Sequence, residues 1–307
     1  MHILITGANG FLGSHLVHYF NAMNTKVTAT GRGFYRDVDL KKKVHYINAE
    51  LTDESQVTSL IQTVQPDVII HNAAMSKPND CHTRRDECLK INVEATRYLL
   101  NAATQISTEK NIHFIFFSTD YIFGENGPHA EEDIPGPLNF YGESKWMAEK
   151  VVTAAKIPTT IIRPVFIYGP ERTGVRSGFV QWVKNSLEKN ESVKVVSDEA
   201  RTPTFVGDIC KGVQAIIDKK KTGVFHLAGS EIISPAEMAI ATANLLGLDA
   251  DLIEVVKGAT LNQPVLRARK SGLTIHKAMN ELNYHPISFE EGLKKTFPVL
   301  NREKFKN

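Results

Sequence analysis

The sequence predicts an α/β protein with a doubly wound parallel sheet and a smaller C-terminal lobe, and three observations support this prediction. Short apolar segments at 2–6, 26–30, 44–47, 65–74 and 112–117 alternate with stretches of helical pattern. The first segment leads directly into a glycine-rich turn that opens a helix. Segment 112–117 is continuously apolar, as in strands buried on both faces of a parallel sheet. Because the alternation loosens beyond Arg163, we expect a main domain at 1–170 and a lobe formed mainly by 171–307, with a strand at about 223–228 returning to the main sheet.

The composition is that of an ordinary soluble globular protein. The 307 residues are 42 % hydrophobic and 23 % charged, and the net charge of +2 is too small to indicate nucleic acid or an anionic membrane as a partner. No apolar run approaches the ~20 residues that span a bilayer, and the first glycine motif begins too early to leave room for a signal peptide. Cys81, Cys88 and Cys210 form no Cys-x-x-Cys pair and indicate free thiols in a reducing compartment. Since only His82 lies close to these cysteines, no metal site is predicted. The free thiols and the lack of a signal peptide lead us to expect a cytoplasmic protein.

A glycine motif follows the first strand and opens the first helix. Gly7 permits a tight turn, Gly10 lets the backbone approach a pyrophosphate, and Gly13 lets the helix pack on the strand. The helix N-terminus offers unpaired N–H groups to the phosphates. Because the motif stands between a strand and a helix, it predicts dinucleotide binding in a Rossmann domain. The cofactor contacts expected from it are Gly7, Asn9, Gly10, Phe11, Leu12 and Gly13.

The end of the second strand indicates which dinucleotide is bound. An NAD-preferring site places Asp or Glu there to bond the ribose 2′-hydroxyl, whereas this chain reads Thr30-Gly31-Arg32-Gly33. Arg32 can pair bidentately with a 2′-phosphate, so NADP(H) is the preferred cofactor and NAD(H) the alternative. The competing interpretation is that Arg32 lies in a solvated loop.

Two later strand ends add expected cofactor contacts. Glu50 and Leu51 follow the third strand, where a polar and an apolar side chain together suit the edge of an adenine. The small residues of Asn72-Ala73-Ala74 follow the fourth strand and leave room for a ribose and a nicotinamide over the sheet.

Tyr141 and Lys145 lie four positions apart in a segment of helical pattern, so both side chains project from one face. A phenol titrates near pH ~10, and a neighbouring ammonium stabilises its anion. The pair therefore suits proton transfer to or from a substrate. The alternative is a helix with one half-buried Tyr and one solvated Lys. The buried strand at 112–117 delivers Thr119 and Asp120 to the carboxyl edge of the sheet, where ligands bind in such folds.

Several residues are expected to act only in local structure. Asp53 is placed to cap the helix near 55, Asp208 to cap a later helix, and Ser234 to form a capping box with Glu237. His71 is expected to be a hydrogen-bonded histidine at a strand end. The segment 75–85 is expected to be a loop, the segment 86–103 a helix, and 302–306 a frayed tail.

Taken together, these residues resemble the extended short-chain dehydrogenase/reductase family. The matching pieces are the three glycines, Asn72-Ala73-Ala74, Asn92, Ser118-Thr119, Tyr141-x-x-x-Lys145, and Arg163-Pro164 running to Tyr168-Gly169-Pro170. Within the family, the strings at 118–123 and 137–142 look most like dTDP-4-dehydrorhamnose reductase and its relatives. The resemblance implies that Thr119 bonds the reacting carbonyl oxygen, Tyr141 gives it a proton, and Lys145 holds the nicotinamide ribose and lowers the pKa of the phenol. It also implies cofactor contacts at Asn92 and Arg163. Because Asn92 is a polar residue on an otherwise apolar helix face, its amide is also expected to bond backbone at a strand end.

Two departures from the family pattern bear on the reaction. Sugar-nucleotide dehydratases of the family carry Thr-Asp-Glu where this chain has Tyr121 after Asp120, so dehydration loses its base and simple reduction is favoured. Asp120 then either assists proton transfer near the substrate or is only a polar residue at the sheet edge. The rhamnose-type reductases show an Ala-Tyr-Thr-x-Val-Asp string after the fourth strand, and this chain instead continues from Ala74 with Met75, which leaves the sugar open.

The C-terminal half contributes basic residues that suit a substrate diphosphate. Arg201 is expected to bind paired phosphate oxygens, with the alternative that it pins its loop to a carboxylate. Arg267 belongs to a basic cluster with Arg269 and Lys270, which is either a substrate-phosphate site or a solvated charge run.

The function predicted from these features is the NADPH-dependent reduction of a 4-keto sugar nucleotide. A 4-epimerase that retains NAD is the main rival within the family. Outside the enzyme class, the alternative is a non-catalytic, NADP-binding regulatory subunit of methionine adenosyltransferase. The expected partner is a small sugar nucleotide, without nucleic acid or membrane, and the protein is expected to form a homodimer.

Overall fold

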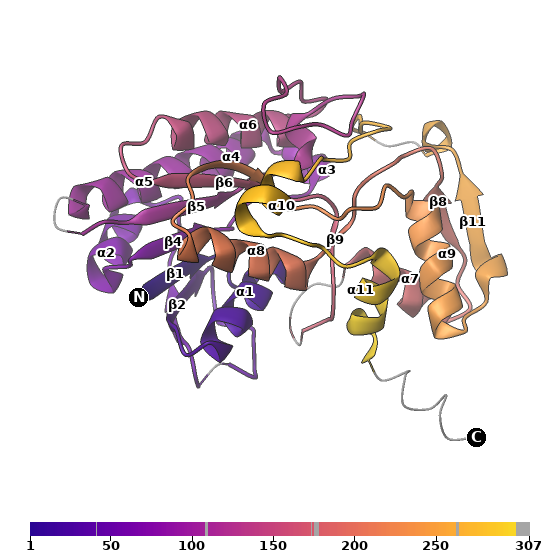
Figure 1. Ribbon diagram of the computed structural model, residues 1–307, viewed down its shortest axis with the longest axis horizontal. Coiled ribbons are helices and arrows are strands. Elements are labelled where there is room, and N and C mark those ends of the chain that lie inside the picture. Colours follow the sequence, from indigo (N-terminus) through magenta and orange to yellow (C-terminus); the bar gives the residue numbers. More distant parts are fainter. Residues whose placement is uncertain (41, 108–109, 173, 175–177, 262–263, 299–307) are drawn as a thin grey trace.

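A computed structural model of the chain describes residues 1–298 with the exception of 41, 108–109, 173, 175–177 and 262–263 (Figure 1). The expected frayed tail at 302–306 lies outside the described residues. Among those residues, no helix combines the length and the apolarity needed to cross a bilayer.

The main domain is built on a seven-stranded sheet in which all neighbouring strands are parallel. Its strand order is β10-β6-β5-β4-β1-β2-β3, so the direction of winding reverses between β1 and β4. In such sheets ligands bind outside the carboxyl ends of the strands at this reversal. The prediction of a doubly wound parallel sheet is confirmed. The strands are β1 (His2–Thr6), β2 (Lys26–Gly31), β3 (His45–Asn48), β4 (Val68–His71), β5 (His113–Phe117), β6 (Thr159–Arg163) and β10 (Gly223–His226).

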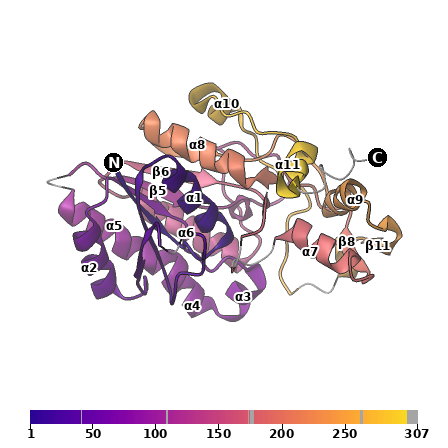
Figure 2. The same cartoon turned by 90° about the horizontal axis from the view of Figure 1, so that it is seen from below.

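Both faces of the sheet are covered by helices, which explains why its central strands are apolar throughout. Ile3 and Ile5 of β1 face one core, while Leu4 between them faces the other. The first core is covered by α1 (Phe11–Ala22), α8 (Val206–Asp218) and α10 (His276–Leu282), and the second by α2 (Glu54–Val64), α5 (Ala95–Ile106) and α6 (Phe140–Thr153). Figure 2 shows α8 and α10 on one side of the strands and α2 and α5 on the other.

A smaller lobe lies at one end of the main domain, at the right of Figure 1. It contains the parallel pair β8 (Val193–Val196) and β11 (Ile253–Val256), against which α7 (Phe179–Leu187) and α9 (Pro235–Leu246) pack. The short pair β7 (Ile167–Tyr168) and β9 (Thr204–Phe205) connects the lobe to the main domain, and α11 (Phe289–Thr296) packs beside it. Residues after 171 thus form this lobe and also supply β10, α8 and α10 to the main domain.

The structure corrects two expected segments between β4 and β5. The segment 75–85, expected as a loop, contains α3 (Pro78–Thr83) and the first residue of α4 (Arg85–Leu89). The segment 86–103, expected as one regular helix, is interrupted by a π-helical turn over Lys90–Glu94 before α5 begins. Single π-helical turns of this kind are frequent at functional sites, and this one contains Asn92.

The expected helix caps divide into two groups. Asp53 accepts hydrogen bonds from the backbone N–H groups of residues 55 and 56, and Ser234 forms a capping box with Glu237, as predicted. Asp208 is not a cap, because α8 already begins at Val206. Its Oδ2 atom instead accepts a hydrogen bond from the backbone N–H of Ile287, 2.9 Å away, and ties α8 to the C-terminal segment.

Candidate active site

The glycine turn lies against the end of β4. Gly7 has φ +67°, and a Cβ atom there would lie 2.8 Å from the backbone nitrogen of Ala73, so only glycine fits. A Cβ on Gly13 would lie 2.2 Å from the carbonyl oxygen of Gly7, which shows how closely α1 packs on the turn. Thr6 Oγ1 accepts hydrogen bonds from the backbone N–H groups of Asn72 and Ala73, both 3.1 Å away. The expected glycine contacts and the expected Asn72-Ala73-Ala74 contacts are thereby brought together.

The start of α1 offers its N–H groups outward. Gly10 is the N-cap residue and supplies no side chain to cap the helix, which continues for 12 residues from Phe11. Leu12 is buried in the core, and Phe11 packs edge-on against His15 at the base of the site. An uncapped N-terminus of this length suits a phosphate group.

Asn9 shapes the loop that follows β2. Its Nδ2 atom donates to the carbonyl oxygens of Arg32 (3.2 Å) and Phe34 (3.1 Å), and its Oδ1 atom accepts from the backbone N–H of Arg36 (2.9 Å). The side chain of Arg32 is 66 % exposed, and its Nη1 atom lies 3.8 Å from Glu50 Oε2. The sequence offered no carboxylate at the end of β2, but the fold brings Glu50 to this position from the end of β3. Leu51 beside it is buried in the core.

His71 at the end of β4 has both ring nitrogens occupied. Nδ1 bonds Thr6 Oγ1 at 2.8 Å and Nε2 bonds Thr96 Oγ1 at 3.0 Å. Burial lowers the pKa of His71 to about 3, so the ring is neutral at physiological pH. This is the hydrogen-bonded strand-end histidine that the sequence predicted.

Thr119, Tyr141 and Lys145 meet at the carboxyl edge of the sheet, and all three are buried. Asn139 begins α6 by accepting a hydrogen bond from the backbone N–H of Gly142 at 3.1 Å, which fixes where the Tyr141 face of the helix starts. Burial raises the pKa of Tyr141, and a hydrogen bond with Thr119 acts against that rise. At neutral pH Tyr141 therefore carries its proton.

Lys145 is the basic side chain beneath this site. It is 2 % exposed, and its Nζ atom lies 4.0 Å from the centre of the Phe116 ring. Burial lowers its pKa to about 7, against an opposing effect of Glu149. The resemblance implied that Lys145 lowers the pKa of Tyr141. In the structure burial has the larger effect on the phenol, and the group that opposes it most is Thr119.

Asn92 holds the π-helical turn to both α6 and the end of β4. Its Oδ1 atom accepts from the backbone N–H of Met75 (2.8 Å), and its Nδ2 atom donates to the carbonyl oxygen of Met75 (3.1 Å) and to Ser144 Oγ (2.9 Å). Ser144 in turn donates to the carbonyl oxygen of Tyr141 at 2.7 Å. The expected bond from the Asn92 amide to strand-end backbone is present, and Ser144 is a supporting residue that sequence reasoning missed.

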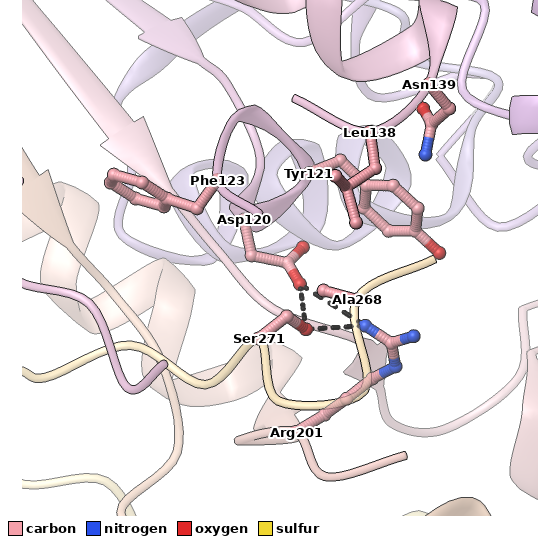
Figure 3. Close-up of a pocket in the computed structure, with 8 residues that line it drawn as sticks. All are labelled: Asp120, Tyr121, Phe123, Leu138, Asn139, Arg201, Ala268 and Ser271. Atoms are coloured by element: carbon pink, nitrogen blue, oxygen red, sulfur yellow. Dashed lines mark hydrogen bonds and ion pairs between the residues drawn. The ribbon is translucent and has the colours of Figure 1, made fainter. Parts of the chain in front are cut away.

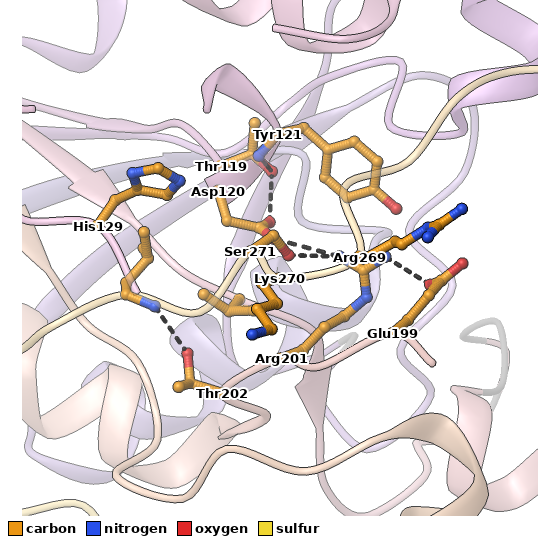
Figure 4. A network of polar contacts seen from close by, with 12 residues as sticks. Thr119, Asp120, Tyr121, His129, Glu199, Arg201, Thr202, Arg269, Lys270 and Ser271 are labelled. Atoms are coloured by element: carbon orange, nitrogen blue, oxygen red, sulfur yellow. Dashed lines mark hydrogen bonds and ion pairs between the residues drawn. The ribbon is translucent and has the colours of Figure 1, made fainter. Parts of the chain in front are cut away.

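A buried polar network connects Thr119 with the small-lobe side of the site. Asp120, which is 2 % exposed, accepts hydrogen bonds from Thr119 Oγ1 at 3.2 Å and from Ser271 Oγ at 3.0 Å. Arg201 Nη1 lies 3.7 Å from Asp120 Oδ2, and Arg201 Nη2 lies 2.6 Å from Glu199 Oε2. Figure 4 shows these side chains converging from three segments of the chain. Burial raises the pKa of Asp120, and Arg201 acts in the opposite direction.

A small pocket opens beside this network. It is lined by residues of the 120–123 and 138–139 segments and of the C-terminal half: Asp120, Tyr121, Phe123, Leu138, Asn139, Arg201, Ala268 and Ser271 (Figure 3). Arg267 is half-buried beside it and acts on the pKa of Tyr121. The three expected substrate residues, Asp120, Arg201 and Arg267, therefore lie in one region.

Two arginines carry structural bonds that the sequence did not reveal. Arg163 is 4 % exposed, donates to both carboxylate oxygens of Glu149 at 3.0 and 2.8 Å, and donates to the carbonyl oxygen of Glu131 at 3.0 Å. Its side chain thus ties β6 to α6, and the cofactor contact expected of Arg163 stays a prediction. Arg201 makes the ion pair with Glu199 that was the alternative to phosphate binding. Glu199 and Ser271 belong to none of the motifs described above, so the sequence alone does not identify them as site residues.

The three cysteines are free and buried. Cys81 and Cys88 pack with Tyr141 and Met75 in one apolar cluster against the Tyr141 face of α6.

Comparisons with known proteins agree with this geometry. The family model described as "RmlD substrate binding domain" matches residues 1–301. The "Probable low-salt glycan biosynthesis reductase Agl14" of Haloferax volcanii is 29 % identical over 95 % of this chain and 96 % of its own length. Subunit beta of methionine adenosyltransferase 2 from Rattus norvegicus is 31 % identical over 87 % of this chain and 78 % of its own length.

Among solved structures, dTDP-4-dehydrorhamnose reductase from Bacillus anthracis in complex with NADP shares the fold, with a TM-score of 0.84 over 97 % of this chain and 98 % of that one, at 24 % identity. The model match covers the glycine turn, the Tyr141–Lys145 helix and the small lobe together. The chain therefore belongs to the RmlD substrate binding domain family.

Proposed function

We propose that this protein uses NADPH to reduce the 4-keto group of a nucleotide-linked deoxy sugar. One observation carries the proposal: Thr119, Tyr141 and Lys145 are buried together at the carboxyl edge of the sheet, on the side where the glycine turn and the end of β4 meet. Membership of a family with a solved dTDP-4-dehydrorhamnose reductase and a relative named as a glycan biosynthesis reductase supports the reaction type.

The residues at the glycine turn fit a dinucleotide. The close approach of backbone leaves no room for a side chain at Gly7 or Gly13, and the N-terminus of α1 is uncapped and suits the pyrophosphate. Arg32 is exposed on a loop held by Asn9, where its guanidinium suits a 2′-phosphate. When bound, NADPH would supply the hydride.

The chain's own residues would then manage the proton and the developing charge. Hydride addition to a ketone produces an alkoxide, which needs a proton donor beside it. Tyr141 is protonated at neutral pH and provides that donor, and a positioned general acid is worth ~10²–10⁴ in rate. Thr119 lies beside the phenol; its hydroxyl donates to Asp120, and it would donate to the same carbonyl oxygen by turning from Asp120 to it. Lys145, one turn further along α6, would supply a cation when protonated.

The region around Asp120 suits the sugar nucleotide. Tyr121 stands where a dehydratase would need a carboxylate base, so the site lacks the second acid–base group that elimination of water requires. Arg267 lies beside the pocket and can meet a substrate phosphate. Arg201 would reach a phosphate only by leaving Glu199, so we assign it first to the protein network.

Two further expectations stay predictions. The three free cysteines support a reducing compartment such as the cytoplasm. The homodimer is tested by the molecular mass of the protein in solution.

A second function is favoured by the similarity to subunit beta of methionine adenosyltransferase 2, at 31 % identity. In that case the protein would bind NADP and a synthetase subunit without turning over a sugar. The buried set of Thr119, Tyr141 and Lys145 favours catalysis, because a binding subunit has no need of a proton donor.

The deciding experiment follows NADPH oxidation by its absorbance against dTDP-4-keto-6-deoxy sugars, other 4-keto sugar nucleotides and simple ketones, with NADH in parallel. We expect turnover with one class of nucleotide sugar and a preference for NADPH. Tight binding of NADPH without turnover of any substrate, together with copurification of a synthetase subunit, would contradict the reductase and favour the regulatory role.

A further inference from the structure

Ser271 lies where a segment of the C-terminal half crosses the end of β5. It is 2 % exposed, and its backbone N–H donates to the carbonyl oxygen of Ala200 at 3.1 Å. Two short bridges, between Ala200 and Lys270 and between His129 and Leu273, hold the segment on either side of it. The position of its side chain is therefore fixed by backbone from both halves of the molecule.

The hydroxyl of Ser271 has one direction in which it can donate. Arg201 Nη1 lies 2.5 Å from Ser271 Oγ, and because a guanidinium only donates, the serine oxygen accepts this bond. The single serine proton is then directed to Asp120 Oδ2, 3.0 Å away. Figures 3 and 4 show Arg201, Ser271 and Asp120 in this sequence.

The other oxygen of the same carboxylate orients Thr119. Asp120 Oδ1 accepts from Thr119 Oγ1 at 3.2 Å, and Thr119 Oγ1 accepts from the backbone N–H of Tyr121 at 3.3 Å. With these two bonds made, a lone pair of the threonine oxygen is left for the Tyr141 phenol, with which it forms a hydrogen bond. The orientation of the Thr119 hydroxyl thus depends on how the Asp120 carboxylate is held.

Ser271 is the closer of the two groups that hold Asp120 Oδ2. Arg201 Nη1 lies 3.7 Å from that oxygen, beyond hydrogen-bond distance, and the guanidinium is already paired with Glu199 at 2.6 Å. Without the serine hydroxyl, the carboxylate would keep only the longer ion pair on this side and could rotate about its Cβ–Cγ bond.

We propose that Ser271 is a positioning residue for the reduction: it fixes the Asp120 carboxylate, which takes the Thr119 proton, so that the Thr119 oxygen keeps one orientation toward the Tyr141 phenol. This inference rests on the proposed reductase function and adds a residue from the far half of the chain to its machinery. A purely structural role, in which Ser271 only joins the two halves, is the competing explanation.

The test compares Ser271→Ala with the matched control Thr274→Val. Thr274 lies in the same segment, and its hydroxyl also crosses to the main domain, at 3.3 Å from the carbonyl oxygen of His129, but it does not touch Asp120. We expect Ser271→Ala to lower kcat by about threefold to tenfold, the loss that follows from one hydrogen bond, while the KM for the keto sugar and the Kd for NADPH change by less than about twofold. Thr274→Val should leave kcat unchanged.

A double-mutant cycle separates positioning from structure. If Ser271 acts through Thr119, then Ser271→Ala should have no further effect on kcat in a Thr119→Val background. Equal losses in both backgrounds, an unchanged kcat in Ser271→Ala, or an equal loss in Thr274→Val would each overturn the proposal. If the wild-type protein turns over no keto sugar, the reductase function is contradicted, and this inference with it. If the wild type is active but one of the three contrary outcomes occurs, only the role of Ser271 is refuted.

Discussion

Replacing Tyr141 with phenylalanine tests the proposed chemistry most directly. The substitution keeps the ring, which packs in a cluster with Met75 and Cys81 and meets Tyr121 edge-on with 5.5 Å between the ring centres. It removes only the hydroxyl and its hydrogen bond with Thr119, so the free energy of unfolding should change by about 0.5–1.5 kcal/mol. The proton donor to the alkoxide is lost completely, and we expect kcat to fall by ~10²-fold or more, which corresponds to roughly 2.7 kcal/mol in the activation barrier.

The assay is the initial rate of NADPH oxidation with saturating keto sugar nucleotide, together with NADPH binding measured by fluorescence. Because the donor is needed mainly in the transition state, the Kd for NADPH should stay within about twofold of wild type. Tyr168→Phe is the matched control: Tyr168 is buried, and its hydroxyl bonds the carbonyl oxygen of Phe289 in α11 and none of the proposed catalytic side chains. Unaltered turnover in Tyr141→Phe would refute the assignment of the proton donor, and an equal loss in Tyr168→Phe would show that the effect is structural.

Three further predictions address the cofactor, the fold and pH. Arg32→Ala should weaken NADPH by about tenfold or more and NADH far less, since charge-assisted bonds to a 2′-phosphate are worth roughly 1.5–3 kcal/mol; equal losses in titrations of the two cofactors would mean that Arg32 does not read the phosphate. Glu149→Ala should lower the free energy of unfolding in urea by about 3–5 kcal/mol, because it leaves the Arg163 charge buried and unpaired, and a loss under 1 kcal/mol would count against this account. Lys145 has a pKa of about 7 in the folded protein and about 10.5 when unfolded, so the unfolded state binds more protons between these values and stability should rise with pH there. Lys145→Met should accordingly exceed wild type in stability by more at pH 6 than at pH 9.5, and a difference independent of pH would contradict the shift.

The sequence was sufficient for the fold and for placing the candidate site residues at one edge of the sheet, because both depend on local patterns. Alternating strands and helices, one of the strands apolar throughout, predicted a parallel sheet covered on both faces, and the reversal between β1 and β4 places the glycine turn at its carboxyl edge. The spacing of Tyr141 and Lys145 required only a helix to bring the two side chains to one face, and α6 provides it.

The parts that could not be predicted depend on contacts between distant segments. The π-helical turn at Lys90–Glu94 has no local sequence signal, and the Asn92 side chain within it bonds Met75 and Ser144, which lie 17 and 52 positions away along the chain. Ser271 reaches Asp120 across 151 positions. One polar residue in a sequence indicates that a partner is needed but not which residue supplies it.

The arginines that the sequence predicted as ligands differ in how deeply they are buried. Arg163 is buried and paired with both carboxylate oxygens of Glu149. If it moved toward a ligand, the Glu149 charge would be left unpaired in the core, so we assign Arg163 to the fold. Arg201 is as deeply buried, and its strong pair with Glu199 makes it a scaffold for the polar network before it is a ligand. Arg32 is the opposite case: it is 66 % exposed, and its pair with Glu50 spans 3.8 Å, a surface contact of the kind that contributes little to stability. Turning Arg32 toward a 2′-phosphate would therefore cost almost nothing, and this low cost is what makes an exposed guanidinium at the end of β2 suited to a cofactor that must bind and leave in every cycle.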